Sequence, residues 1–105
     1  MRKRDRQILD QLARELRARF PEARVWAFGS RARGTATKDS DFDVCIVLDQ
    51  WDEAIDEVIL ELAWRVSFEH GVVITTVPYT REEFEHGPCS VSPLVRTVLR
   101  EGVPV

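Results

Sequence analysis

Apolar residues recur at helical spacing in three parts of the chain. The first predicts a helix from about Asp5 to Arg19, ended before Pro21, and its apolar positions are Ile8, Leu9, Leu12, Ala13, Leu16 and Phe20. The second predicts a helix from about Trp51 to Glu69, with a buried stripe of Ala54, Ile55, Val58, Ile59, Leu62, Ala63 and Val66. The third begins at Ser92-Pro93 and ends before Gly102, and it buries Leu94, Val95, Val98 and Leu99.

Three short apolar runs predict strands. Val25 to Phe28 ends at Gly29, and Val44 to Leu48 follows a pair of aspartates. Val72 to Val77 is the third run, which we expect Pro78 to stop. Thr80-Arg81-Glu82-Glu83 is a capping box that starts a short helix reaching Phe84 or Glu85. Strands separated by helices predict the α/β (α+β) class, a small mixed sheet packed with helices, and we expect residues 1–105 to form a single domain.

Three aromatic residues of the second helix lie partly off its buried stripe: Trp51, Trp64 and Phe68. If they are exposed they mark a partner surface, and if they are covered they enlarge the core. The sequence leaves both interpretations open.

Composition narrows the class of protein. The 105 residues are 44% hydrophobic and 31% charged, as in soluble globular domains, and no apolar run approaches the length of a membrane span. The charged start, Met1 to Asp5, lacks the apolar segment of a signal peptide, so we expect a cytoplasmic protein. Cys45 and Cys89 show no metal or disulfide spacing and are interpreted as reduced thiols. The first helix has a basic face, but the net charge of −3 argues against a general nucleic-acid binder.

Candidate chemistry lies between Val25 and Leu48. Gly29 lets the backbone approach a ligand closely, and Ser30 is a good helix N-cap. A helical turn over Ser30 to Arg33 would present its N-terminus to a phosphate, with Arg31 and Arg33 adding positive charge nearby. Taken alone, a Gly-Ser pair after a strand is also an ordinary turn.

Two carboxylates open the second strand. Strand alternation places Asp41 and Asp43 on one face and Phe42 on the other. Two adjacent carboxylates repel each other unless a cation lies between them, and oxygen ligands beside a phosphate suit Mg²⁺. The segment Asp39 to Asp43 is also compatible with an Asx-rich turn without metal. The whole series, strand, Gly-Ser, ten residues, Asp-x-Asp and apolar strand, is more specific and indicates phosphoryl or nucleotidyl transfer.

Gly29-Ser30, ten residues and Asp41-Phe42-Asp43 together resemble the signature of the minimal nucleotidyltransferases, in the DNA polymerase beta-like nucleotidyltransferase superfamily. Arg31-Ala32-Arg33-Gly34, Ser40 and the closing segment from Ser92 to Val103 are also similar to that family. The resemblance implies a nucleotidyltransferase-like fold. It implies that Gly29 and Ser30, with Arg31 beside them, hold a nucleoside triphosphate, and that Asp41 and Asp43 hold the catalytic metal ions.

The resemblance also implies an activity and a partner. An enzyme of this kind uses Mg²⁺ and ATP to transfer AMP to a hydroxyl. A chain without a separate acceptor domain relies on another protein, and small members resemble antitoxins whose partner is a helical HEPN-domain ribonuclease toxin.

One departure from the family leaves alternatives open. Active members usually carry a third carboxylate on the next strand, where this chain has Thr75. A module that has lost catalysis and neutralises its partner by contact alone is therefore the second hypothesis. Transfer to a small hydroxylated molecule such as an aminoglycoside is a third, which the lack of a second domain disfavours.

Overall fold

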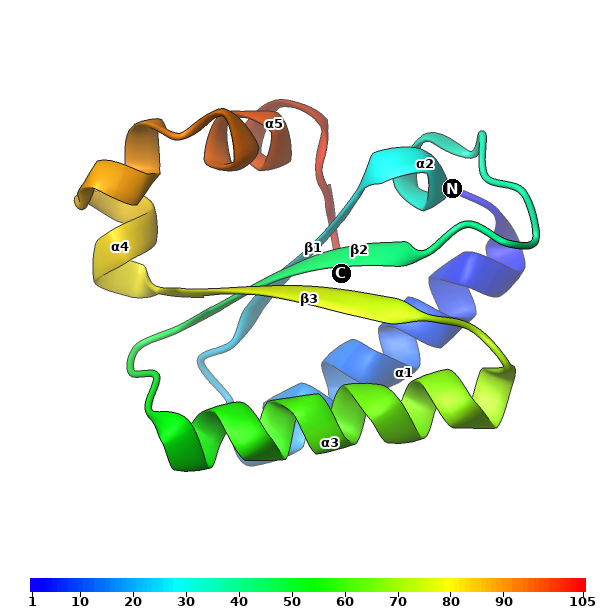
Figure 1. Cartoon of the computed structure of the whole chain (residues 1–105), viewed down its shortest axis with the longest axis horizontal. Helices are drawn as coiled ribbons and strands as arrows, with labels where there is room; N and C mark the ends of the chain where they lie inside the picture. Colours follow the sequence, from blue (N-terminus) through cyan, green and yellow to red (C-terminus); the bar gives the residue numbers. More distant parts are fainter.

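The computed structural model describes residues 1–105 except the side chain of Cys89, so the prediction for that thiol lies outside the described part. Along the chain (Figure 1), the elements are α1 (Lys3–Arg19), β1 (Arg24–Phe28), α2 (Gly29–Arg33), β2 (Phe42–Leu48), α3 (Glu53–His70), β3 (Ile74–Thr80), α4 (Arg81–Glu85), the 3-10 helix η1 (Pro88–Val91), α5 (Pro93–Glu101) and β4 (Val103–Pro104). In this described part, no helix combines the length and apolar character that crossing a membrane requires.

The four strands form one mixed sheet in the order β3-β2-β1-β4. β1 pairs antiparallel with β2 and with β4, whereas β2 and β3 run parallel. The predicted class, a small mixed sheet packed with helices, is confirmed. The sequence did not predict the two-residue β4, which exists because Val103 and Pro104 pair with β1.

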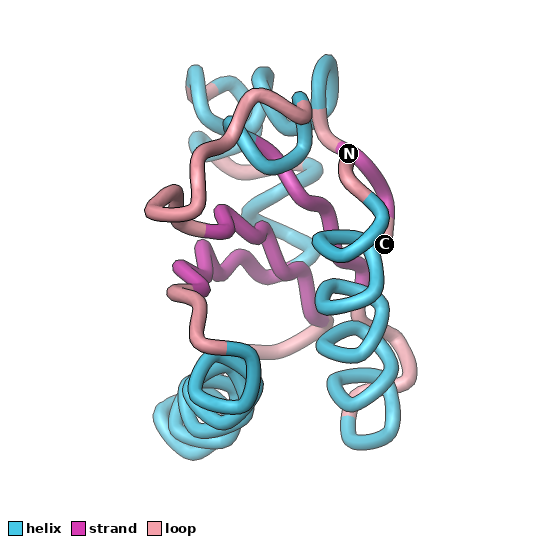
Figure 2. The backbone as a smooth tube through the Cα atoms, turned by 90° about the vertical axis from the view of Figure 1, so that its right-hand side faces the viewer, coloured by secondary structure: helices cyan, strands magenta, loops and turns pink.

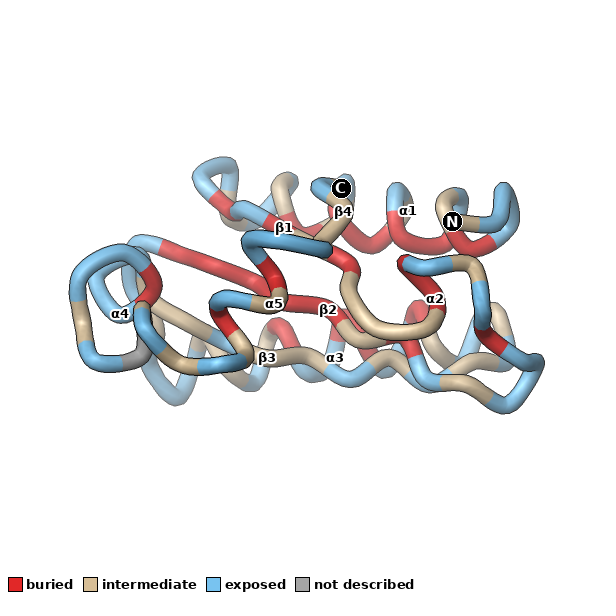
Figure 3. The backbone as a smooth tube through the Cα atoms, turned by 90° about the horizontal axis from the view of Figure 1, so that it is seen from above, coloured by how far each residue is buried: buried red, intermediate tan, exposed pale blue. Residues whose placement is uncertain are grey.

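Helices cover the two faces of the sheet separately (Figures 1 and 2). On one face α1 and α3 enclose the larger core, to which β2 contributes Phe42, Val44 and Ile46. On the other face Cys45 and Val47 pack with Phe84 of α4 and with α5. In Figure 3 the buried residues follow β2 and the sheet-facing turns of α1. The alternation of β2 therefore decides which of its residues face which layer.

The predicted stripe of α1 is confirmed. Its apolar residues are buried except Phe20, which is half-buried. The helix begins at Lys3, two residues before the predicted start. Arg14 and Arg19 of its basic face are exposed, whereas Arg17 is half-buried and donates to the carbonyls of Ala23 and Val105.

Helix α3 begins later than predicted. The carboxylate of Asp52 accepts a hydrogen bond of 2.8 Å from the Ile55 N–H, so Asp52 is the N-cap. Trp51 precedes the helix, half-buried, and its indole donates to Asp56 over 2.9 Å. Of the predicted stripe, Ala54 is exposed, and the fully buried members are Ile59, Leu62, Ala63 and Val66.

The prediction that Pro78 stops the third strand is wrong. β3 begins at Ile74 and continues through Pro78 to Thr80. The Val73 carbonyl accepts a hydrogen bond from the Phe42 N–H, so alternation directs the nitrogen of Pro78 away from β2. β3 lies at the edge of the sheet, where a proline removes no hydrogen bond of the ladder.

The C-terminal elements follow the predicted caps. Glu83 N–H donates to the Thr80 hydroxyl and Thr80 N–H to the Glu83 carboxylate, which is the predicted capping box. Ser92 caps α5 by accepting from the Val95 N–H. Val95 and Val98 are buried, but the prediction that Leu99 is buried is wrong, since it is 62% exposed. The predicted loop at 87–90 is mostly the short helix η1.

Candidate active site

The site lies where β1 ends beside the start of β2. Phe28, the last residue of β1, pairs with Asp43 of β2, and the chain then turns into α2 at Gly29. Gly29 has a φ of 77°, a conformation that side chains disfavour, and a β carbon there would collide with the Asp43 carboxylate oxygen Oδ2. Gly29 therefore allows the turn and the carboxylate to touch, so the structure brings together two of the predicted site residues.

Asp43 is a half-buried carboxylate in a negative environment. Burial is the first cause that raises its pKa above the ordinary value, and the charge of nearby Asp41 raises it further. The positive charge of Arg33 acts in the opposite direction. Asp41 itself is exposed. The two aspartates are thus close enough to interact electrostatically. The predicted strand begins only at Phe42, so Asp41 lies directly before it and not on it.

Thr75 stands next to Asp43 in the parallel ladder of β2 and β3. Paired residues of neighbouring strands project from the same face, so this exposed threonine occupies the position from which a third carboxylate would approach the pair. Two acidic residues near the ends of β3 are engaged elsewhere: Glu69 accepts from Gln11, and Glu83 belongs to the α4 cap. Among the described residues no three side chains of the types His, Cys, Asp and Glu gather to hold a metal.

The donor set that is present nevertheless fits Mg²⁺. This ion usually takes one or two protein carboxylates and completes its shell with water and substrate phosphates. Asp41 and Asp43 supply two carboxylates. Burial and, after it, the charge of Asp41 raise the pKa of Asp43, and a cation between the two aspartates relieves the part that comes from their repulsion. The residues present therefore suit a metal that is shared with a phosphate-containing substrate.

Ser30 and Arg33 line the α2 side of the site. The prediction that Ser30 is the helix N-cap is wrong, because α2 begins at Gly29 after Phe28 and Ser30 is its second residue. The Ser30 hydroxyl is half-exposed and forms no hydrogen bond with the described residues, which leaves it available to a ligand. Arg33 is exposed and close enough to Asp43 to influence its charge. The sequence analysis placed Arg31, and not Arg33, beside the nucleotide, although both lie on one short helix.

The structure places Arg31 inside the protein. The residue is 4% exposed, and its guanidinium lies 4.4 Å from the centre of the Phe42 ring. It donates to the Ser40 carbonyl over 2.8 Å and 3.1 Å, and to the Lys38 carbonyl over 3.4 Å. These contacts order the segment 34–41 that leads into Asp41.

Asp5 is a site-supporting residue that the sequence analysis missed. Its carboxylate is buried and forms an ion pair of 3.2 Å with Arg31, while its second oxygen, Oδ2, has no hydrogen-bond partner among the described residues. A signal was present, because Asp5 stands three residues before Ile8 and so continues the buried stripe of α1.

The segment between α2 and β2 is also closed by its own hydrogen bonds. The Ser40 hydroxyl accepts a bond of 3.0 Å from the Thr37 N–H, and the Ser30 carbonyl accepts one from Thr35. With Arg31 beneath it, this loop connects α2 to Asp41 through hydrogen bonds at Thr35, Thr37 and Ser40.

The second face of β2 also holds Cys45, two residues beyond Asp43. Burial raises the pKa of its thiol to about 12, although Arg24 acts in the opposite direction. The thiol is therefore protonated at neutral pH and takes no part in the chemistry of the site.

Comparisons with known proteins give the family and the fold. The sequence profile of the nucleotidyltransferase domain matches residues 9–104. No curated protein matches the sequence significantly.

Two solved structures share the fold. The first is the MntA-HpeT toxin-antitoxin, in a mutant with two aspartates changed to glutamate. At 19% identity it matches with a TM-score of 0.63, over 90% of this chain and 69% of that chain. The second is a toxin-antitoxin with AMP-PNP. At 22% identity it has a TM-score of 0.62, over 93% of this chain and 69% of that chain.

Proposed function

Because this chain belongs to the nucleotidyltransferase domain family, we propose that it transfers AMP from ATP to a hydroxyl group of a partner protein. The acceptor oxygen bonds to the α-phosphorus, the bond from that phosphorus to the pyrophosphate oxygen breaks, and the hydroxyl proton passes to solvent. The observation that carries the proposal is the contact of Gly29 with the Asp43 carboxylate, beside Asp41. It joins a phosphate-binding turn to a pair of metal ligands.

Each residue has a distinct part in this proposal. Asp41 and Asp43 hold Mg²⁺, which when bound neutralises the phosphate charge and polarises the reacting group. Gly29 and the free hydroxyl of Ser30 receive the triphosphate, and Arg33 adds positive charge at the same edge. Arg31, predicted as a nucleotide ligand, contributes here by ordering the loop that carries Asp41.

We further propose that the chain is a cytoplasmic antitoxin and that its acceptor is a toxin, a HEPN-domain ribonuclease. The support is the fold shared with two toxin-antitoxin proteins, one of them solved with AMP-PNP. The mutant neighbour is altered at two aspartates with one residue between them, the same spacing as Asp41 and Asp43.

The second candidate function is neutralisation by contact alone. Thr75 favours it, because its place beside Asp43 provides no third carboxylate to complete a metal site or to accept the proton. The retained pair of aspartates favours the enzyme, since a contact module gains nothing from two repelling carboxylates.

The test is to incubate the purified protein with α-labelled ATP, Mg²⁺ and a lysate of its host. A labelled protein band is expected, and it should disappear in Asp41→Asn and Asp43→Asn. Asp39→Asn changes an exposed aspartate of the same loop and is the matched control, which should retain labelling. Labelling that survives both site variants would exclude the proposed mechanism.

Thr75→Asp separates the two candidate functions. If Thr75 occupies the vacant position of a third ligand, the added carboxylate should increase the rate of labelling. A protein that binds its partner but labels nothing, with or without this substitution, would support the contact module.

A further inference from the structure

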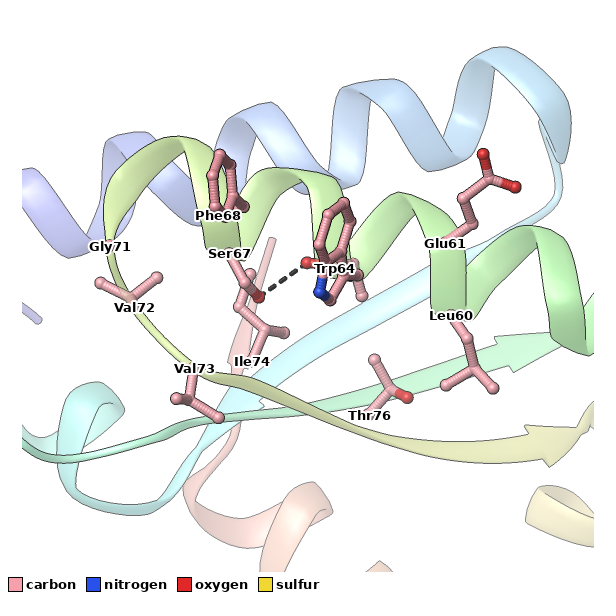
Figure 4. Close-up of a pocket in the computed structure, with 11 residues that line it drawn as sticks. Leu60, Glu61, Trp64, Ser67, Phe68, Gly71, Val72, Val73, Ile74 and Thr76 are labelled. Carbon is pink, nitrogen blue, oxygen red and sulfur yellow. Dashed lines mark hydrogen bonds between the residues drawn. The ribbon is translucent and has the colours of Figure 1, made fainter.

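An apolar groove of about 960 Å³ runs between α3 and the start of β3 (Figure 4). Its exposed apolar side chains are Leu60, Trp64, Phe68 and Val73, which are 52%, 65%, 78% and 58% exposed. Large apolar side chains gathered on one surface mark an interaction site. Of the two interpretations of the aromatic residues in this helix, the exposed partner surface applies to Trp64 and Phe68, which are not part of the core.

The groove has a preformed shape. Trp64 and Phe68 lie one turn apart on α3 and stack with ring centroids 5.5 Å apart and planes at 18°. Behind them Ala63 and Val66 already close the core, so the exposed aromatics are not needed to complete it. A partner that covers them would bury a rigid aromatic surface at little cost in side-chain entropy.

The groove lies on the opposite face of the sheet from the candidate active site. Thr76 lines it and pairs with Val44, which faces α1 and α3. Asp43 and Thr75 are the preceding residues of the same two strands and project from the other face. A molecule seated in the groove would therefore leave the nucleotide site open.

The charge along the α3 side of the groove is negative, although at the end of that helix the Arg4 guanidinium donates to the His70 carbonyl over 3.1 Å. Glu61 is the charged residue among those that line it, and Glu57 lies one turn earlier on α3. Neither has an ion-pair partner among the described residues. Arg65, the nearby basic residue of the helix, is already paired with Glu15 over 2.8 Å. The rim therefore complements a basic partner.

We propose that the groove binds an amphipathic helix of the partner protein, with an apolar stripe flanked by lysine or arginine. Leu60, Trp64 and Phe68 extend over about 12 Å along α3, a length that matches i, i+4 and i+7 anchors of a second helix. The inference rests on the proposed function, because it assigns the helix to the protein that receives the nucleotide.

Two other occupants fit less well. A second copy of this chain, placed by two-fold symmetry, would bring the acidic rim against itself. An added strand would need the open edge of β3, where Pro78 offers no N–H and only Ile74 and Thr76 precede it with outward backbone groups.

The test uses a synthetic helix of about 18 residues, long enough to form a helix in isolation, with leucines at the anchor spacing and flanking lysines. A second peptide has glutamates in place of the lysines, and a third has the lysine peptide's composition in scrambled order. Binding is followed by the emission of Trp64, isolated by comparison with Trp64→Phe because Trp26 and Trp51 are half-buried. We expect the lysine peptide alone to bind, with a blue shift of Trp64 and an affinity that falls with added salt.

Groove variants give the matched comparison. Phe68→Ser with Leu60→Ser should weaken binding about thirtyfold, as expected for loss of central anchors. Val91→Ser with Leu99→Ser alters two apolar residues of similar exposure, 64% and 62%, outside the groove and should change nothing. Equal binding of the three peptides, or no effect of the groove variants, would overturn the inference. If sedimentation shows that the wild type is a dimer and that Phe68→Ser dissociates it, the groove serves self-association and the inference of a partner helix is overturned.

The same variants separate this inference from the proposed function. Asp41→Asn should abolish nucleotide transfer while it binds the lysine peptide like the wild type. The groove variants should lose labelling of the protein acceptor and keep Mg²⁺-dependent binding of ATP. If the groove variants still transfer the nucleotide to the acceptor at the wild-type rate, the docking site is overturned, whereas the proposed transferase function is unaffected.

Discussion

Gly29 combines a positive φ with a contact to the Asp43 carboxylate. Replacement by alanine imposes a side chain at a φ of 77° and drives its β carbon into the Asp43 carboxylate. The conformational strain alone is about 1–2 kcal/mol, and the collision adds to it. We therefore expect Gly29→Ala to lower the free energy of unfolding by more than that, measured in urea, and to abolish labelling.

Gly34→Ala is the matched control for this substitution. Gly34 has a φ of 76°, but its nearest neighbour to an added β carbon is the Met1 nitrogen at 3.9 Å. It should show the strain without the loss of labelling. If the two variants behave alike, the contact of Gly29 with Asp43 has no functional weight.

The raised pKa of Asp43 makes a prediction about stability and pH. An acid whose pKa is higher in the folded than in the unfolded chain stabilises the fold fully only below its ordinary value of 3.8, and this contribution is lost as pH rises through the raised pKa. Without metal, Asp43→Asn should therefore melt at a higher temperature than the wild type at pH 7. The difference in melting temperature between the two proteins should shrink as the pH falls toward 4. A wild type that melts at a higher temperature than Asp43→Asn at pH 7 would contradict this prediction.

At the scale of elements, the ion pair of Asp5 and Arg31 joins α1 to the loop before β2. Asp5→Ala leaves the buried guanidinium without its carboxylate, which should cost about 3–5 kcal/mol of unfolding free energy in urea. Replacing both partners with Asp5→Leu and Arg31→Met should restore most of that stability.

The double variant also tests what the ion pair does for the site. It removes the donors that hold the Ser40 and Lys38 carbonyls, so the loop that carries Asp41 loses its support. In a direct binding measurement, we expect the double variant to bind ATP in the presence of Mg²⁺ more weakly than the wild type does. Normal binding would assign the pair to stability alone.

Local patterns predicted most elements but not the contacts between them. The stripe of α1 and the caps of α4 and α5 follow from spacing and from side chains that bond within one turn. Pro78 was misjudged because its effect depends on whether β3 lies at the edge of the sheet. Strand β4 depends on β1, far away in sequence, for its pairing.

The candidate site divides in the same way. Gly29, Ser30, Asp41 and Asp43 could be selected from one continuous segment, because their order and spacing are in the sequence. The partnership of Arg31 with Asp5 could not, since 26 positions separate them and only the folded chain brings them together. Exposure of Trp64 and Phe68 was equally undetermined, because α3 has more apolar residues than one stripe requires.

At the scale of the whole molecule, the sheet separates two surfaces with different chemistry. One face carries Asp43, with Asp41 beside it, and the opposite face carries the groove between α3 and β3. A ligand that binds only the folded state stabilises it by mass action. Mg²⁺ with a non-hydrolysable ATP, at one hundred times its dissociation constant, should therefore add about 2.7 kcal/mol to the unfolding free energy.

This stabilisation should depend on the aspartates and not on the groove. Asp43→Asn should show no thermal shift with Mg²⁺ and the nucleotide, whereas Phe68→Ser should shift like the wild type. A loss of the shift in Phe68→Ser would mean that the two surfaces are coupled through the sheet.

The rate at which a thiol reagent modifies Cys45 reports how often the sheet opens. Its thiol lies within β2 and has a pKa of about 12, so a thiol reagent can reach it as a reactive thiolate only when β2 separates from its neighbours. In a Cys89→Ser background, the rate of labelling at neutral pH therefore counts how often the central strand is released. Because β2 also carries Asp43, any nucleotide that binds at the site should lower the rate of Cys45 modification. That decrease would measure ligand binding without a radioactive or fluorescent probe.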